Sequence, residues 1–123
     1  MTQRGSAAVE LALVLPLALL VALALVQVGL LGKDALLVEQ AAREGAREAA
    51  VTVQDERARE AALRAGDLAP ERTDVEIERA GSVGDPVTVR VHYRSPMVVP
   101  FVDWLLPEEV TLTSAVTMRQ EAG

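Results

Sequence analysis

Hydrophobic positions along this chain change pattern twice, from an unbroken run to a helical period and then to alternation. The unbroken run extends from Leu11 to Gly32, which is 22 residues (32 − 11 + 1) without a charged side chain. A helix needs about 20 such residues to cross a bilayer. A chain of 123 residues is too small to surround a buried helix of that length. The pattern therefore predicts a membrane-spanning helix over residues 6–32.

The start of this segment leaves three interpretations open. The small residues Ala22 and Ala24 match the A-x-A site of a cleaved secretory signal, but the apolar run continues beyond them. An uncleaved signal-anchor helix fits the length and leaves Glu10 unexplained, because a carboxylate inside a membrane segment is costly. The third interpretation takes Gly5 and Glu10 together as a processing signal, with residues 1–5 as a short leader.

Charges that flank the apolar run predict its orientation. Arg4 and the free amino terminus lie before it, while Lys33 after it is nearly neutralised by the adjacent Asp34. Positive charge tends to stay on the cytoplasmic side of a membrane helix. We therefore expect a single pass, with the amino terminus in the cytoplasm and residues 33–123 outside.

A helical period continues from Lys33 to Gly66 without a proline. Pairs of opposite charge at helical spacing support it, such as Glu39 with Arg43 and Asp55 with Arg59. Glycine at 66, soon followed by a proline, is typical of a helix end. The pattern predicts an extracytoplasmic amphipathic helix over residues 33–66 that continues the membrane helix.

Small residues recur every four positions in this helix, at Ala41, Gly45 and Ala49. Such residues let another element approach the helix backbone closely. One hypothesis is a helix-packing stripe for a partner protein. The other, which we favour, is that the stripe packs on the sheet of the same domain, as amphipathic helices usually do.

Alternation of apolar and polar residues replaces the helical period after residue 70. Residues 73–79, 87–93 and 109–119 each place valine, isoleucine, leucine or methionine at every second position, with few exceptions. Such alternation is typical of strands with one buried face. We predict an α+β fold in which the distal half of the long helix covers a small three-stranded, antiparallel sheet over residues 70–123.

The segment between the second and third predicted strands, residues 95–107, is unusually apolar for a loop and contains three prolines. It carries Phe101 and Trp104, two of the three aromatic residues of the chain. One hypothesis makes these two a hydrophobic contact for another subunit, the membrane surface or an assembly platform. The favoured alternative is a cap on the end of the core, because large exposed apolar patches are uncommon.

Composition excludes several classes of function. The net charge of −6 is the wrong sign for a nucleic-acid-binding protein, and the absence of cysteine removes disulfides and thiolate chemistry. The single histidine, His92, falls on the polar side of a predicted strand without convergent partners. We therefore expect no enzyme, no metal or other cofactor, no nucleic acid and no small-molecule substrate.

The start of the chain resembles the processing site of type IV prepilins, in which a glycine precedes the cut and a glutamate follows as the fifth mature residue. Here Gly5 is followed by Ser6-Ala7-Ala8-Val9-Glu10. Joined to "LALVLPLALL" and to "VEQAAREGAREAA", this stretch resembles the TadE-like minor pseudopilins of tight-adherence (Flp-type) pilus systems. The resemblance covers roughly residues 4–50, with Leu11 where phenylalanine is frequent.

This resemblance implies a pilin-like protein of the bacterial cytoplasmic membrane that a prepilin peptidase cuts between Gly5 and Ser6. Its partners would be the lipid bilayer, other pilin or pseudopilin subunits and the pilus assembly platform. It also implies that Glu10 pairs with a new amino terminus during subunit assembly, whereas a Glu10 at headgroup depth would need no partner. The alternative function is an uncleaved, membrane-anchored binding module outside the cytoplasm.

Overall fold

A computed structural model describes residues 3–97 and 109–121. A helix of 49 residues, α1 (Gln3–Val51), is followed by the shorter helix α2 (Asp55–Gly66) and by one 3-10 turn at Pro70–Arg72. Three strands complete the chain. They are β1 (Thr73–Arg79), β2 (Pro86–Pro96) and β3 (Glu109–Arg119).

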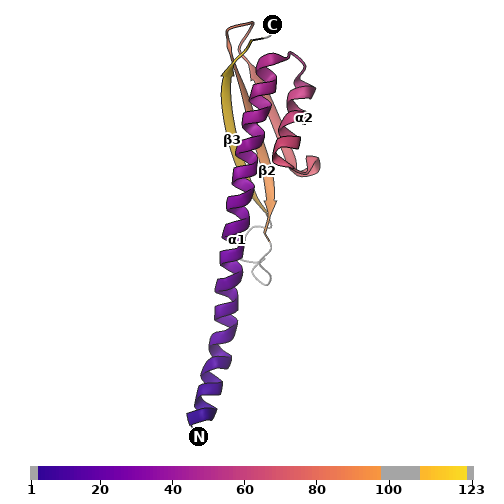
Figure 1. Cartoon of the computed structure of the whole chain (residues 1–123). Coiled ribbons are helices and arrows are strands. Elements are labelled where there is room, and N and C mark those ends of the chain that lie inside the picture. The colour runs from indigo at the N-terminus through magenta and orange to yellow at the C-terminus, as the bar shows by residue number, and fades with distance from the viewer. Residues whose placement is uncertain (1–2, 98–108, 122–123) are drawn as a thin grey trace.

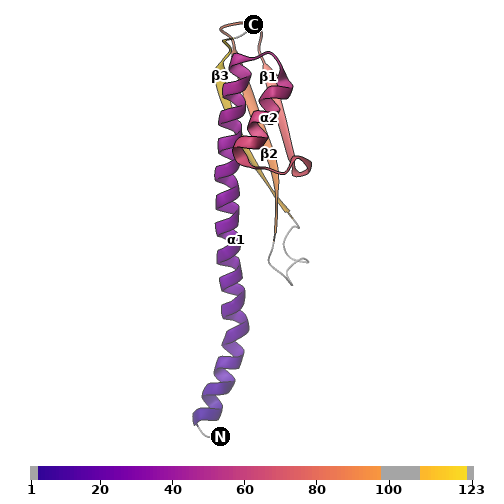
Figure 2. The ribbon, with the colours of Figure 1, turned by 45° about the vertical axis from the view of Figure 1, so that its right-hand side comes forward.

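The two halves of α1 have different surroundings (Figure 1). The amino-terminal half extends away from the rest of the molecule, and its apolar side chains are exposed. The carboxy-terminal half lies along the sheet, with α2 beside it (Figure 2). Among the described residues, α1 is the helix whose length and composition suffice to cross a membrane, and the most apolar window has no buried residue. This fits a single-pass membrane protein.

The sheet is antiparallel, in the order β1-β2-β3. Val75 is opposite Val91 in the first pair of strands, and Val91 is opposite Ser114 in the second. The turn between β1 and β2 uses Gly84 at φ +94°, a backbone conformation that favours glycine. These elements confirm the predicted α+β class, with a three-stranded antiparallel sheet packed on the distal half of the long helix.

The core is small and aliphatic, as the scarcity of aromatic residues predicts. Alanines from both helices meet valines from the central strand, and no residue larger than valine is fully buried among those described. The partly buried Tyr93 packs at its border. The buried hydrophobic residues are Val38, Ala41, Ala42, Ala46, Ala49, Ala50, Ala58, Ala62, Leu68, Val75, Val87, Val89 and Val91.

The predicted continuous helix over residues 33–66 is wrong in one respect, because the chain leaves the helix after Val51 and turns back. Residues 52–54 separate α1 from α2, and α2 packs against α1. A run of β-branched residues, Val51-Thr52-Val53, is unfavourable in a helix. Asp55 and Glu56 then supply acidic side chains to the first turn of α2, where the helix dipole favours them.

The predicted end of the helical region at Gly66 is confirmed. A Cβ at this position would lie 2.7 Å from the main-chain oxygen of Leu37, so only glycine allows α2 to approach α1 this closely. Asp67 follows in the left-handed conformation, and its N–H donates to the Arg64 carbonyl. Such a cap satisfies carbonyls that a helix end leaves unpaired.

Candidate functional site

The residues of the predicted processing signal lie in the first turns of α1. The bond between Gly5 and Ser6 is close to the start of the helix, where helices fray most easily. Ser6 and Glu10 are four positions apart, so their side chains lie on the same face of α1. Both are exposed, and the amino-terminal end of α1 lies far from the sheet (Figure 1).

Glu10 is surrounded by apolar side chains rather than by charges. Its neighbours Val9 and Leu11 are both exposed, and the described part of the chain offers it no ion pair. A carboxylate inside a membrane helix is costly. An ammonium group at close range offsets part of such a cost. If Glu10 lies within the membrane, a cationic partner would therefore stabilise it.

The predicted helix-packing stripe lies against other elements of the same chain. Ala41, Gly45 and Ala49 are all buried within the domain. A Cβ on Gly45 would lie 3.0 Å from Ala62 Cβ on α2 and 3.1 Å from Val89 Cγ1 on β2. The stripe therefore serves close packing of α1 against the rest of its own chain, which is the alternative favoured from sequence.

Charged residues beside the stripe remain on the surface. Arg43 forms an ion pair with Glu39, as the helical spacing predicts. Arg47 Nη1 lies 3.9 Å from Glu44 Oε1. Of the second predicted pair, Arg59 instead meets Glu56 at 2.9 Å.

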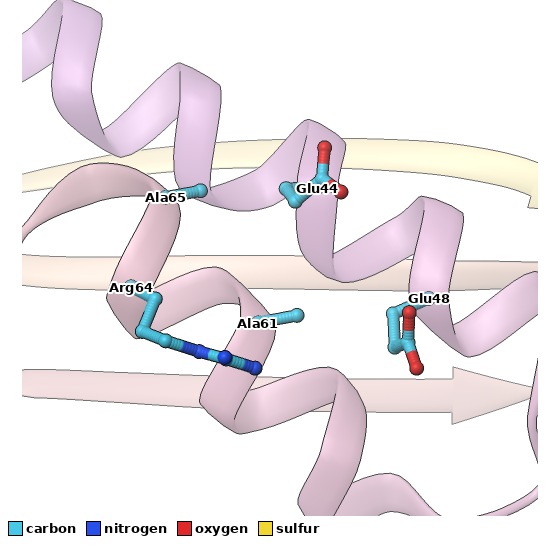
Figure 3. Close-up of a pocket in the computed structure, with 5 residues that line it drawn as sticks. All are labelled: Glu44, Glu48, Ala61, Arg64 and Ala65. Carbon is cyan, nitrogen blue, oxygen red and sulfur yellow. The ribbon is translucent and has the colours of Figure 1, made fainter.

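A shallow groove of about 380 Å³ runs between the two helices (Figure 3). Glu44 and Glu48 reach it from α1, and Arg64 reaches it from α2, with Ala61 and Ala65 between them. The groove offers acids and one base without a nucleophile or a histidine. Within residues 3–97 and 109–121, no group of three or more histidines, cysteines or acids is placed to hold a metal ion.

His92 lies on the polar face of the sheet. Its Nδ1 is 2.9 Å from Thr113 Oγ1, and its Nε2 is 3.6 Å from Glu76 Oε1. These neighbours belong to the adjacent strands, and they form part of a network of cross-strand polar pairs. The geometry therefore makes His92 a member of these cross-strand polar pairs.

Phe101 and Trp104, the candidate hydrophobic contact, lie outside the described residues. One polar contact close to the described end of β2 is not predicted by the sequence. Ser95 is buried near the end of β2, and its Oγ donates to Asp34 Oδ2 over 2.5 Å. This contact joins the sheet to α1 just beyond its apolar half. Only the three-dimensional structure brings these residues together, 61 positions apart.

Comparison with known families supports the resemblance seen in the sequence. Residues 5–47 match the family model of TadE-like proteins. The matched segment begins at Gly5, includes Glu10 and ends in the part of α1 that packs on the sheet. No curated protein and no solved structure matches the chain.

Proposed function

We propose that this chain is a minor pseudopilin-like structural or assembly component of a tight-adherence (Flp-type) pilus system. It is inserted in the bacterial cytoplasmic membrane by the apolar half of α1, with its amino terminus in the cytoplasm. A prepilin peptidase cuts it between Gly5 and Ser6. The domain outside the membrane then meets other pilin or pseudopilin subunits and the assembly platform.

The observation that carries this proposal is the TadE-like match from residue 5 to residue 47. The proposal is also supported by the apolar half of α1, whose most apolar window has no buried residue. An uncovered apolar helix of this length needs either lipid or other helices around it. A pilus subunit is surrounded by lipid before assembly and by the helices of other subunits after it.

Cleavage would give Glu10 a cationic partner, which none of the described residues provides. Removal of residues 1–5 leaves an α-amino group on Ser6, at the positive end of the α1 dipole. Glu10 lies one helical turn further along, so a neighbouring subunit shifted along its helix presents Glu10 to that amino group. Pairing in a low-dielectric setting would fix the relative height of the two subunits.

The mature amino terminus tests the proposal. The full chain is co-expressed with a prepilin peptidase, purified in detergent and sequenced from its amino end. We expect Ser6 as the first residue. A Gly5→Leu variant should remain uncut, while Gly29→Leu, the same change further along the helix where a Cβ meets nothing within 4 Å, should be cut normally.

Two results would contradict this function. A leader that stays intact beside an active peptidase would favour the uncleaved, membrane-anchored binding module. A mature chain that starts after Ala24 would indicate a secretory signal and a protein released from the membrane.

A further inference from the structure

The two edges of the sheet differ in how they are protected. At the β1 edge, Arg59 of α2 donates from Nη2 to the main-chain oxygen of Val75 over 3.3 Å. At the β3 edge, no strand pairs with the outer side in the part of the chain that the structure describes. The strand is 11 residues long, so its open edge is long as well.

The main-chain groups on the open edge can be identified from the ladder. Gln120 N donates to Asp85 O, and Gln120 O accepts from Gly84 N, so this residue turns its polar groups toward the β2 side. Alternate residues of an antiparallel strand bond to the same neighbour. The even-numbered residues of β3 therefore bond to β2, and the odd-numbered ones direct N–H and C=O outward. The outward residues include Thr111, Thr113, Ala115, Thr117 and Arg119.

The middle of this edge, residues 110–118, carries none of the usual guards against pairing. Natural edge strands are protected by charges, proline or bulges. Between Glu109 and Arg119 there is no charged residue and no proline, and the register with β2 is continuous. Threonine, which recurs along the exposed side, is also favourable in strands.

A hollow lies beside the distal end of the same edge. It has a volume of about 420 Å³ and is lined by Ala50 and Val51 of α1 and by Met118 of β3. Arg47, Arg119 and Glu121 also line it. Arg47 pairs with Glu44, whereas Arg119 has no ion pair with the described residues. The alternate residues of β3 that face α1 are only partly buried, so this side of the core is incompletely covered.

A second copy of this chain does not fit the edge. The β3 strand runs in the same direction as α1 (Figure 1), so antiparallel pairing of two β3 strands would point the two membrane helices in opposite directions. Two copies in one membrane would instead have parallel β3 strands, related by a twofold axis that runs along the strands. This axis turns equivalent side chains of the two strands, at the same level, toward opposite faces of the joined sheet. In a parallel pair of strands, side chains at the same level lie on the same face, so the two strands cannot pair in this way. Pairing of β3 with β1 of another copy is also unfavourable, because Arg59 already bonds to a main-chain oxygen on the outer edge of β1.

We propose that the open edge of β3 binds an extended segment of a different protein as an antiparallel fourth strand. Main-chain hydrogen bonds give such binding its affinity, and alternate side chains give it specificity. The segment has apolar residues at every second position, which fill the hollow and cover the inner side of β3. It has an acidic residue opposite Arg119, which lines the hollow and has no ion pair with the described residues.

A synthetic peptide tests this proposal on the full chain in detergent. The probe is the capped heptapeptide Glu-Val-Thr-Val-Thr-Val-Lys, whose glutamate is designed to lie opposite Arg119. Amide hydrogen exchange is followed residue by residue. At a free peptide concentration of about ten times its Kd, we expect amide exchange to slow about tenfold at Thr113, Ala115 and Thr117. The amides of Ser114 and Val116, which already bond to β2, should change little.

Matched controls separate edge pairing from other binding. Ala115→Pro removes an outward N–H and leaves the β2 ladder intact, so it should abolish the protection, while Ala115→Val should retain it. The charge-reversed peptide Lys-Val-Thr-Val-Thr-Val-Glu should bind several-fold more weakly. Absence of protection with the first peptide, protection at Val75 of β1 instead, or protection that appears without peptide as the protein concentration rises would each overturn the proposal.

Discussion

Arg79 at the end of β1 donates a hydrogen bond from Nη1 to the main-chain oxygen of Ala49, over 2.9 Å. Its Nη2 reaches the oxygen of Thr52 at 2.9 Å, and its Nε reaches Asp55 Oδ1 at 2.9 Å. One guanidinium therefore satisfies carbonyls that the end of α1 leaves unpaired and an acid in the first turn of α2. The contacts hold the turn between the two helices against the sheet.

Replacing this arginine should destabilise the domain. In Arg79→Met the stem remains and the three hydrogen bonds are lost, two of them from partly buried carbonyls. Because the side chain is only 18% exposed, we expect a loss of about 2 to 3 kcal/mol in the free energy of unfolding. Hydrogen exchange of the buried Val87 and Val89 amides measures it in the full chain.

The control is the same change on the surface of the sheet. Arg90 pairs with Glu76 at 3.5 Å and Glu78 at 3.1 Å, and both acids are more than half exposed. Exposed pairs contribute at most about 1 kcal/mol. Arg90→Met should therefore cost clearly less than Arg79→Met, and equal losses would show that Arg79 does not hold the turn.

Gly45 is expected to be intolerant of even one added carbon. A Cβ there would lie 3.0 Å from Ala62 Cβ, which is fixed directly to the backbone of α2. We expect Gly45→Ala to destabilise the domain by about 1 to 2 kcal/mol, although alanine favours the helix. Gly32→Ala is the control, because a Cβ at that position meets nothing within 4 Å. It should cause no loss in the same exchange measurement, and a stabilised Gly45→Ala would contradict the close packing.

Much of the fold follows from periodicity, because each element buries one face at its own repeat. The apolar half of α1, the three strands and the end of α2 at Gly66 could be predicted in this way. The turn at residues 52–54 could not be predicted from the continuing helical period, although the β-branched residues around Thr52 and the acidic Asp55 were available signals. Periodicity reports which face is buried and does not report that α1 and α2 bury their faces against each other.

The functional and structural residues likewise include some that the sequence predicts and some that it does not. Gly5, Ser6 and Glu10 form a local pattern, since their spacing along one helix already determines their relative position. Arg79 and Ser95 depend on partners brought together by the fold, so neither carries a signal in the sequence. Arg79 in particular occupies an ordinary polar position at the end of a strand.

The buried Ser95 should hold the sheet to α1 just beyond the apolar half of this helix. Its hydroxyl donates to Asp34 Oδ2 over 2.5 Å, and bonds to charged groups contribute about 1.5 to 3 kcal/mol. We expect Ser95→Ala to accelerate amide exchange at this end of β2. Thr113→Ala, which removes a hydroxyl from the exposed face beside His92, is the control and should have a much smaller effect. Equal effects would indicate that the Asp34 contact contributes nothing specific.

Glu10 offers the clearest separation between processing and assembly. It follows the proposed cut by five residues and lies on the exposed part of α1, so its removal should not disturb the fold. We expect Glu10→Ala to be cut after Gly5 at nearly the normal rate and to be defective in pilus assembly, because a new Ser6 amino group would lose its carboxylate partner. Glu10→Asp keeps the charge on a shorter side chain and should retain part of the function. Amino-terminal sequencing measures the first effect, and counting pili in a strain carrying only the variant measures the second. Normal piliation with Glu10→Ala would show that this glutamate lies at headgroup depth and needs no partner.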